Sequence, residues 1–112
     1  MGKINSRQKG KRAELDLAHK LSDLSGLMCR RSQQYAGING DADVVGLPFI
    51  HIEAKAVERL NIRDAMRQSE SDAREDEMPV VMHKKNRQPW LVTMNLEDFV
   101  TIYKAWLKEW EE

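Results

Sequence analysis

The sequence contains one cysteine, no long apolar run and no excess of charge of either sign. Cys29 alone excludes an internal disulfide bond and a cysteine-rich zinc site, and it fits a reducing compartment. No stretch approaches the roughly 18 consecutive apolar residues of a membrane span, and the charged N-terminal stretch lacks the apolar core of a signal peptide. We therefore expect a single domain of 112 residues that works in the cytoplasm.

Charge is balanced over the whole chain but unevenly distributed along it. The 18 basic and 18 acidic residues cancel, which argues against a protein that simply coats nucleic acid. Residues 1–12 nevertheless carry five basic and no acidic side chains, whereas acidic residues gather at 70–77 and at the C-terminus. This segregation leaves room for a positive face on a neutral protein. We predict a flexible basic arm over residues 1–10 and one folded domain over residues 11–112.

Two short β-type runs flank a turn at Pro48, and together they predict a hairpin with a polar face. Side chains alternate between the two faces of a strand, so His51, Glu53 and Lys55 share one face. A hairpin that pivots on Pro48 places Asp43 opposite Glu53, because each lies five positions from the pivot. Cross-strand partners are separated by about 4.5–5.5 Å at Cβ.

Two carboxylates at that separation repel each other unless a positive charge lies between them. Hard divalent cations such as Mg²⁺ take oxygen ligands of this kind, and Lys55 can reach a water or phosphate beside the metal. The pattern therefore predicts a metal-dependent site that cleaves phosphodiester bonds. The alternative is an ordinary hairpin with a solvated polar face. The apolar neighbours of Asp43 and Glu53, together with a third acidic residue upstream, favour the metal site.

That third acidic residue is Glu14, on a predicted helix over residues 11–25. Leu17, Ala18 and Leu21 are its i+3, i+4 and i+7 neighbours, so Glu14 falls in the middle of an apolar stripe. A carboxylate that faces the core is unfavourable without a partner. Glu14 is therefore a candidate metal ligand, or else an edge residue whose carboxylate reaches solvent.

The rest of the chain alternates between strand and helix patterns. The predicted elements are a strand over 27–34, the hairpin, a helix over 61–76, strands over 80–84 and 90–94, and a helix over 95–110. The order of one helix, three strands, one helix, two strands and one helix predicts an α/β sandwich with a mixed sheet.

The last predicted helix has a wide stripe of apolar and aromatic residues. Its members are Leu96, Phe99, Val100, Tyr103, Trp106, Leu107 and Trp110. Such a stripe can cover the second face of the sheet. Two tryptophans in the last seven positions are more than a terminal helix needs, so this region is also a candidate dimer interface.

Asp43, followed ten residues later by Glu53-Ala54-Lys55, resembles the core signature of the PD-(D/E)xK nuclease superfamily. Two further motifs resemble Holliday junction resolvases of the archaeal type and small resolvase-like nucleases encoded by phages. These motifs are Lys9-Gly10-Lys11-Arg12-Ala13-Glu14 and Arg30-Arg31-Ser32. The resemblance covers roughly residues 7–95.

The chain departs from the signature at one position. Ala42 stands where the signature usually has proline, but that position contributes backbone and no ligand. Asp41 competes with Asp43 for the role of ligand. Asp43 is the residue that leads into Val-Val-Gly, as the family pattern requires.

The resemblance implies a restriction-endonuclease-like three-layer fold, with a central mixed sheet of about five strands flanked by helices. It implies that Glu14, Asp43 and Glu53 hold Mg²⁺, with Mn²⁺ as a substitute and the Ala54 carbonyl as a further ligand. Lys55 would position or activate the attacking water. Gln68, on the flank of the helix over 61–76, matches a glutamine that often supports the catalytic centre in related nucleases.

DNA contacts and a symmetric dimer complete the prediction. Basic, polar or aromatic residues near the site can contact the DNA backbone or stack on a base, although a solvated surface would have the same composition. The candidates are Lys9, Lys11, Arg12, Arg30, Arg31, Ser32, Tyr35, Lys84, Lys85 and Arg87. Resolvases of this resemblance are homodimers that cut two strands symmetrically.

We interpret the chain as a Mg²⁺-dependent DNA endonuclease, structure-selective for Holliday junctions or other branched DNA. Cys29 has no motif around it, and the three histidines show no zinc spacing, so nothing indicates a nucleophilic triad. Two alternatives are a nicking or DNA-end-processing nuclease of the same fold and a non-catalytic DNA-binding accessory protein. The complete set of acidic residues argues against the second alternative, because carboxylates repel phosphate.

Overall fold

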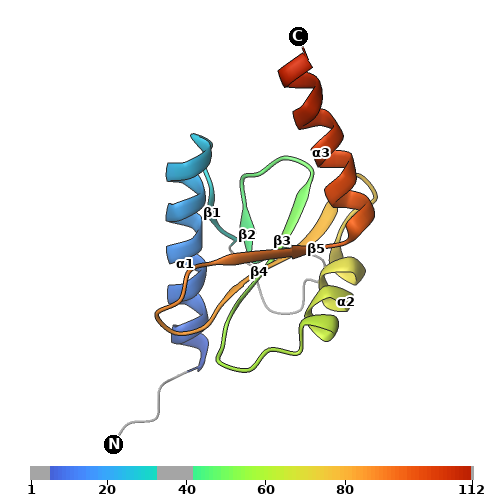
Figure 1. Ribbon diagram of the computed structural model, residues 1–112. Coiled ribbons are helices and arrows are strands. Elements are labelled where there is room, and N and C mark those ends of the chain that lie inside the picture. The colour runs from blue at the N-terminus through green and yellow to red at the C-terminus, as the bar shows by residue number, and fades with distance from the viewer. Residues whose placement is uncertain (1–5, 33–41, 112) are drawn as a thin grey trace, which may run out of the picture.

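The computed structural model describes residues 6–32 and 42–111, which form a five-stranded mixed sheet with helices on both faces (Figure 1). The strands lie in the order β1-β2-β3-β4-β5. In chain order the elements are α1 (Ser6–Ser25), β1 (Arg30–Arg31), β2 (Val44–Val45), β3 (Ile50–Ala56), α2 (Ile62–Asp72), β4 (Met78–Lys84), β5 (Leu91–Met94) and α3 (Leu96–Glu111). The predicted α/β class, mixed sheet and element order are confirmed.

The two longest strands lie next to each other in the sheet. β3 and β4 run parallel over seven residues each, from Ile50 opposite Met78 to Ala56 opposite Lys84. The other neighbouring strands pair antiparallel. A parallel pair needs a crossover connection, and α2 provides it. β3 is therefore held on both sides by neighbouring strands, which makes it a firm support for functional side chains.

The two faces of the sheet carry separate apolar clusters. On one face Leu17 and Ala18 of α1 pack against Val44 and Ile52, because residues three and four apart share one side of a helix. On the other face Ala65 and Met66 of α2 pack against Val81. This arrangement gives three layers, with α1 and α2 outside and the sheet between them.

The basic N-terminal segment is more ordered than predicted. α1 begins at Ser6, so residues 6–10 are helical, and the prediction of a flexible arm is wrong for them. Extending an existing helix by one turn avoids the free-energy cost of nucleating a new helix. This saving outweighs the helix-propensity penalty of about 1 kcal/mol for Gly10. Residues 1–5 lie outside the described residues.

Two elements are shorter than their patterns predicted. β1 spans two residues instead of the predicted strand over 27–34, because Ser22 Oγ of α1 binds both the N–H and the carbonyl of Cys29 and draws this segment toward the helix. The end of that prediction lies outside the described residues. α2 ends at Asp72, where Ala73 takes an extended conformation, although the pattern predicted helix to residue 76. Asn61 caps the start of α2, since its side-chain Oδ1 accepts the N–H of Asp64.

α3 does not cover the sheet. It contains no buried residue, and Figure 1 shows it running away from β5 toward the C-terminus. The second face of the sheet is occupied by α2, so the interpretation of α3 as a cover for that face is wrong. Within residues 6–32 and 42–111, no helix is long and apolar enough to cross a membrane.

Candidate active site

The β2–β3 pair has the register that the sequence predicted. Val44 lies opposite Ile52, and the Asp43 N–H donates to the Ile52 carbonyl at 2.9 Å. Asp43 lies one residue before β2, and its carboxyl is close enough to Glu53 for the two charges to interact. The turn between the strands includes Phe49, whose φ of 69° lies in the left-handed region.

The Asp43 carboxylate is fixed by a hydrogen bond and partly buried. One of its oxygens, Oδ2, accepts the Ala54 N–H at 2.9 Å. The pKa of Asp43 is raised to about 7, first by burial and then by the charge of Glu53, while the Ala54 N–H opposes the shift. Glu53 is itself buried, at 4% exposure. A pair of carboxylates in this environment is stabilised by a cation, so the donor set fits a divalent metal.

Glu14 points toward the same region from α1. Its Oε1 accepts a 2.7 Å hydrogen bond from Arg31 Nε on β1, and both side chains are partly exposed. The charge of Glu14 also contributes to the raised pKa of Asp43, after burial and Glu53. The predicted buried carboxylate therefore has a basic partner, and it lies close enough to Asp43 to act on it electrostatically.

Lys55 lies two residues beyond Glu53 on β3, opposite His83 of β4, and it is partly buried. Its positive charge acts on Asp43 in the opposite direction to the two glutamates, and lowers the pKa of that carboxyl. The alternation of β3 places Lys55 on the same face as Glu53. The structure therefore brings the Glu53-Ala54-Lys55 motif and Asp43 to one place.

Other predicted residues are less directly connected to this centre. Gln68 is exposed on α2. The neighbouring Ser69 is buried and donates through Oγ to the Val80 carbonyl, so it is a support for the sheet. Ser32 continues the β1–β2 pairing through its N–H, which donates to the Asp43 carbonyl at 3.0 Å. Tyr35 lies outside the described residues.

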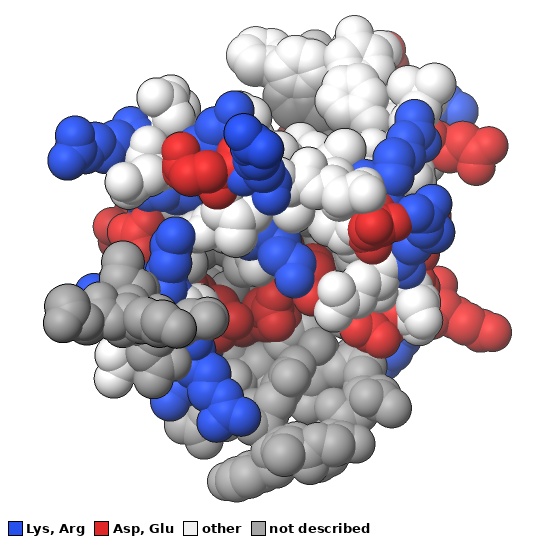
Figure 2. All heavy atoms as spheres, turned by 90° about the horizontal axis from the view of Figure 1, so that it is seen from below, with Lys and Arg blue, Asp and Glu red and all other residues white. Residues whose placement is uncertain are grey.

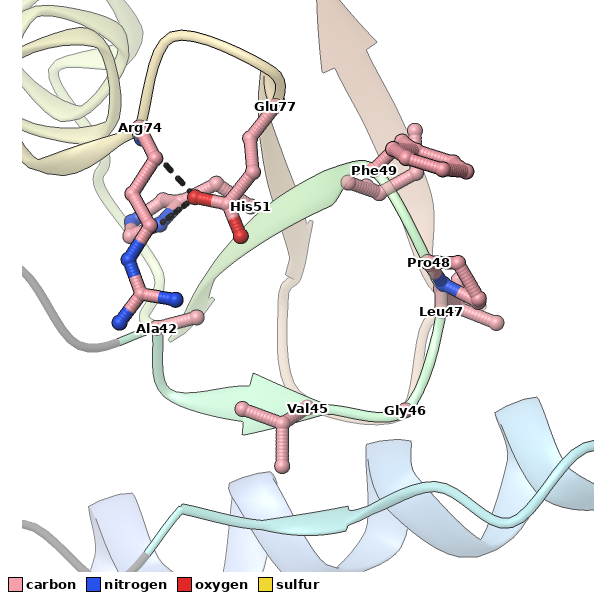
Figure 3. A pocket seen from close by; sticks show the side chains of 10 residues that line it. Ala42, Val45, Gly46, Leu47, Pro48, Phe49, His51, Arg74 and Glu77 are labelled. Carbon is pink, nitrogen blue, oxygen red and sulfur yellow. Dashed lines mark hydrogen bonds and ion pairs between the residues drawn. The ribbon is translucent and has the colours of Figure 1, made fainter.

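Two residues with ligand atoms at this site had been given no role from the sequence. Among the described residues, one group of three offers ligand atoms within 4.8 Å of one another: His51, Glu53 and Asp72. His51 is 1% exposed, and its Nδ1 lies 3.6 Å from Oε1 of Glu77 (Figure 3). The signal for His51 was present, because it shares the β3 face with Glu53. Asp72 comes from the end of α2, and only the crossover places it there.

Basic side chains surround the acidic centre. Lys9 and Arg12 of α1 line a cavity of about 290 Å³ together with Lys84 and Trp90. The Trp90 ring is held by a 2.9 Å hydrogen bond from Nε1 to Asp16, and Lys84 Nζ lies 5.8 Å from its centroid. Figure 2 shows acidic atoms in a recess near the middle of one face, with Lys and Arg side chains around it. Phosphates that approach this face meet positive charge at the rim and carboxylates in the recess.

The remaining predicted DNA contacts lie on α1, on β1 and in the turn between β4 and β5. Lys11 is exposed on α1, and Arg30 is exposed on β1. Lys85 and Arg87 are exposed in the turn between β4 and β5, where Arg87 has a φ of 63°. These positions leave the side chains accessible to a ligand as large as DNA.

Comparison with known proteins agrees with this geometry. The fold matches the 1.6 Å structure of Hjc, a Holliday junction resolvase from the archaeal hyperthermophile Archaeoglobus fulgidus, with a TM-score of 0.59 and 25% sequence identity. The match covers 77% of this chain and 72% of that chain, and it confirms the predicted restriction-endonuclease-like fold. No curated protein matches the chain significantly.

The family comparison covers nearly the whole sequence. Residues 5–111 match the family described as "Phage putative PDDEXK endonuclease". The chain therefore belongs to this phage family of PD-(D/E)xK nucleases.

Proposed function

We propose that the protein is a metal-dependent DNA endonuclease that selects Holliday junctions or other branched DNA. The observation that supports the proposal is that Asp43 accepts the Ala54 N–H and interacts electrostatically with Glu53 and Lys55 of the same strand. Membership of a nuclease family supports hydrolysis of phosphodiester bonds, and the structural similarity to a Holliday junction resolvase supports branched DNA as the substrate.

Mg²⁺ is the proposed cofactor, and Mn²⁺ is expected to substitute for it. Glu14, Asp43 and Glu53 would hold the metal through carboxylate oxygens, and the Ala54 carbonyl would add a neutral ligand. When bound, the metal would polarise the scissile phosphate and lower the pKa of a water molecule. Ala54 would serve twice, because its N–H already fixes the orientation of Asp43.

Lys55 is the proposed catalytic cation. Its ammonium group would orient the attacking water and stabilise the negative charge that develops on the phosphate. Attack in line with the leaving group forms a bond from the water oxygen to phosphorus and breaks the bond from phosphorus to the 3′ oxygen. The products are then a 5′-phosphate and a 3′-hydroxyl. Gln68 is proposed to support this centre from α2.

The DNA would cross the face that carries the basic rim. Lys9, Lys11 and Arg12 would contact phosphates together with Lys84, Lys85 and Arg87, since Lys9, Arg12 and Lys84 line one cavity. Arg30, Arg31, Ser32 and Tyr35 would contribute from β1 and the segment that follows it. Phosphate contacts of this kind position the duplex without reading its sequence, which suits recognition of a branched shape.

We propose that two copies of the chain pair through α3. Successive rings form a ladder along one side of this helix, with centroid separations of 6.3 Å for Phe99–Tyr103, 5.8 Å for Tyr103–Trp106 and 5.9 Å for Trp106–Trp110. These side chains are 46–72% exposed in the single chain. A contiguous apolar surface of this kind marks an interface, and two active sites are what paired cuts in a junction require. Action in the cytoplasm of the host cell is part of the same proposal.

The decisive experiment compares a labelled four-way junction with its matched linear duplex in Mg²⁺, Mn²⁺ or EDTA. We expect paired, metal-dependent cuts in the junction alone, and loss of cleavage by Lys55→Ala with junction binding retained. Lys20→Ala, an exposed change on α1, is the matched control and is expected to cut like the wild type.

Each of the other outcomes would indicate a different function. Equal cutting of both substrates would leave the nuclease and remove the selectivity, as for a nicking or end-processing enzyme. Binding without cleavage in any divalent metal would favour the non-catalytic accessory protein. Cleavage by Lys55→Ala at the wild-type rate would overturn the assigned catalytic centre.

A further inference from the structure

An unusual histidine lies beside the carboxylate that the nuclease motif supplies. His51 is 1% exposed, and its Nε2 has no hydrogen-bond partner. Buried polar atoms in folded proteins are almost always paired, so an unpaired imidazole nitrogen needs an explanation. The nearest carboxylate oxygen, Oε1 of Glu53, is 3.6 Å from Nε2 and too far for a hydrogen bond.

The distances around this nitrogen fit a metal ion better than a hydrogen bond. The ligand atoms of His51, Glu53 and Asp72 all lie within 4.8 Å of one another. Metal–ligand bonds of about 2.0–2.2 Å place neighbouring ligand atoms about 3.0–3.5 Å apart, and opposite ones about 4.2 Å apart. The observed spacing therefore needs only small side-chain adjustments to close around an ion.

The other ring nitrogen of His51 faces a carboxylate, as the second ring nitrogen of a metal-binding histidine usually does. His51 Nδ1 faces Oε1 of Glu77 at 3.6 Å, and that oxygen also accepts the Arg74 N–H at 2.9 Å, as Figure 3 shows. A carboxylate at Nδ1 favours the tautomer that carries its proton there, which leaves the Nε2 lone pair free for a metal. Asp72 is partly exposed, so an ion can reach the site from solvent.

We propose that His51, Glu53 and Asp72 form a second divalent-cation site that selects Zn²⁺ or Mn²⁺ over Mg²⁺ and shares Glu53 with the catalytic centre. Imidazole nitrogen is a good ligand for zinc and other transition metals, whereas Mg²⁺ prefers oxygen alone. Glu53 lies between His51 on one side and Lys55 on the other along β3, so it can serve both sites. The shared use of Glu53 rests on the proposed nuclease function, but the binding of the ion does not.

The test is titration of the intact protein with Zn²⁺ in saturating Mg²⁺, followed by calorimetry, with Co²⁺ visible absorption as a second readout. We expect one Zn²⁺ per chain, weakened at least about 100-fold by His51→Gln and at least about tenfold by Asp72→Asn. Asp76→Asn changes an exposed acidic residue just beyond α2 and is the matched control, with wild-type affinity expected. Circular dichroism establishes that each variant is folded.

Two results would overturn the proposal. One is unchanged Zn²⁺ affinity in a folded His51→Gln, and the other is stoichiometric displacement of Zn²⁺ by Mg²⁺. Should His51→Gln fail to fold, Asp72→Asn decides, because its side chain is partly exposed, and wild-type affinity in that variant contradicts the site. Zn²⁺ binding is measured without DNA and is therefore independent of the cleavage assay. Zn²⁺ binding without DNA cleavage would support this site and contradict the nuclease. DNA cleavage without Zn²⁺ binding would support the nuclease and contradict this site.

Discussion

The first and last helices of this protein have similar sequence patterns and opposite surroundings. α1 and α3 both carry an apolar stripe at helical spacing, yet α1 buries Leu17 and Ala18 against the sheet while α3 buries no residue. α1 also carries Glu14, whose polar partner comes from β1. An amphipathic pattern therefore specifies which side of a helix is apolar, but not what that side contacts.

The largest expected effect is on the free energy of unfolding, when a buried leucine side chain of α1 is removed. Leu17→Ala should lower the free energy of unfolding by about 2–5 kcal/mol, because Leu17 is 2% exposed within the main core cluster. The same change in α3, Leu96→Ala, should alter it by less than about 0.5 kcal/mol, since Leu96 is 76% exposed. Urea unfolding at low protein concentration measures both values. Equal losses for the two variants would mean that α3 packs as α1 does.

The next effect concerns association through α3. Trp106→Glu should convert the proposed dimer to a monomer, because it places a charge in the middle of the aromatic ladder. Thr101→Glu introduces the same charge on the opposite side of the helix and should leave the dimer intact. Light scattering coupled to size exclusion measures the mass of each. A monomeric wild type across the concentration range would remove the proposed interface.

The smallest effect is a pH dependence that belongs to the candidate active site. The pKa of Asp43 is raised from 3.8 to about 7, so the unfolded chain loses this proton at lower pH than the folded protein does. Stability in EDTA should therefore be greatest at low pH within the range from about pH 4 to pH 7, and should fall as the pH rises through it. His51 acts in the same direction: burial opposes its charge, but Glu53, Glu77 and Asp72 raise its pKa above 6.5.

Melting temperatures at about pH 5.5 and about pH 8 measure this dependence. The wild type in EDTA should melt lower at the higher pH, and Mn²⁺ should restore stability there by favouring the ionised carboxylates. The Asp43→Asn variant has no titrating group at this position, so its melting temperature should fall less between the two pH values. A decline of the same size in Asp43→Asn would assign the dependence to other groups.

Much of the candidate site could be predicted from the sequence because its geometry is local. The alternation of β3 and the count to the turn at Pro48 predicted the register of the hairpin, and the pairing of Val44 with Ile52 agrees with that count. Residues at that separation along the chain have few ways to pair once one face of each strand is apolar. The same local rules predicted the last two strands, β4 and β5, which pair antiparallel.

The prediction failed where contacts join distant segments. Arg31 binds Glu14 across a separation of 17 residues, which depends on how β1 docks along α1. Asp72 approaches His51 only because β3 and β4 are parallel and α2 crosses back between them. No periodicity in either segment carries this information.

The sequence by itself determined the secondary structure of most of the chain, the face of β3 that carries the nuclease motif and the register of the β2–β3 hairpin. These follow from backbone geometry and from alternation over short distances. The tertiary structure decided which amphipathic helix covers the sheet, which basic residue pairs with Glu14 and which acidic residue joins His51. Those choices depend on burial and electrostatics summed over the whole fold, because a contact between distant segments forms only when both are packed in place.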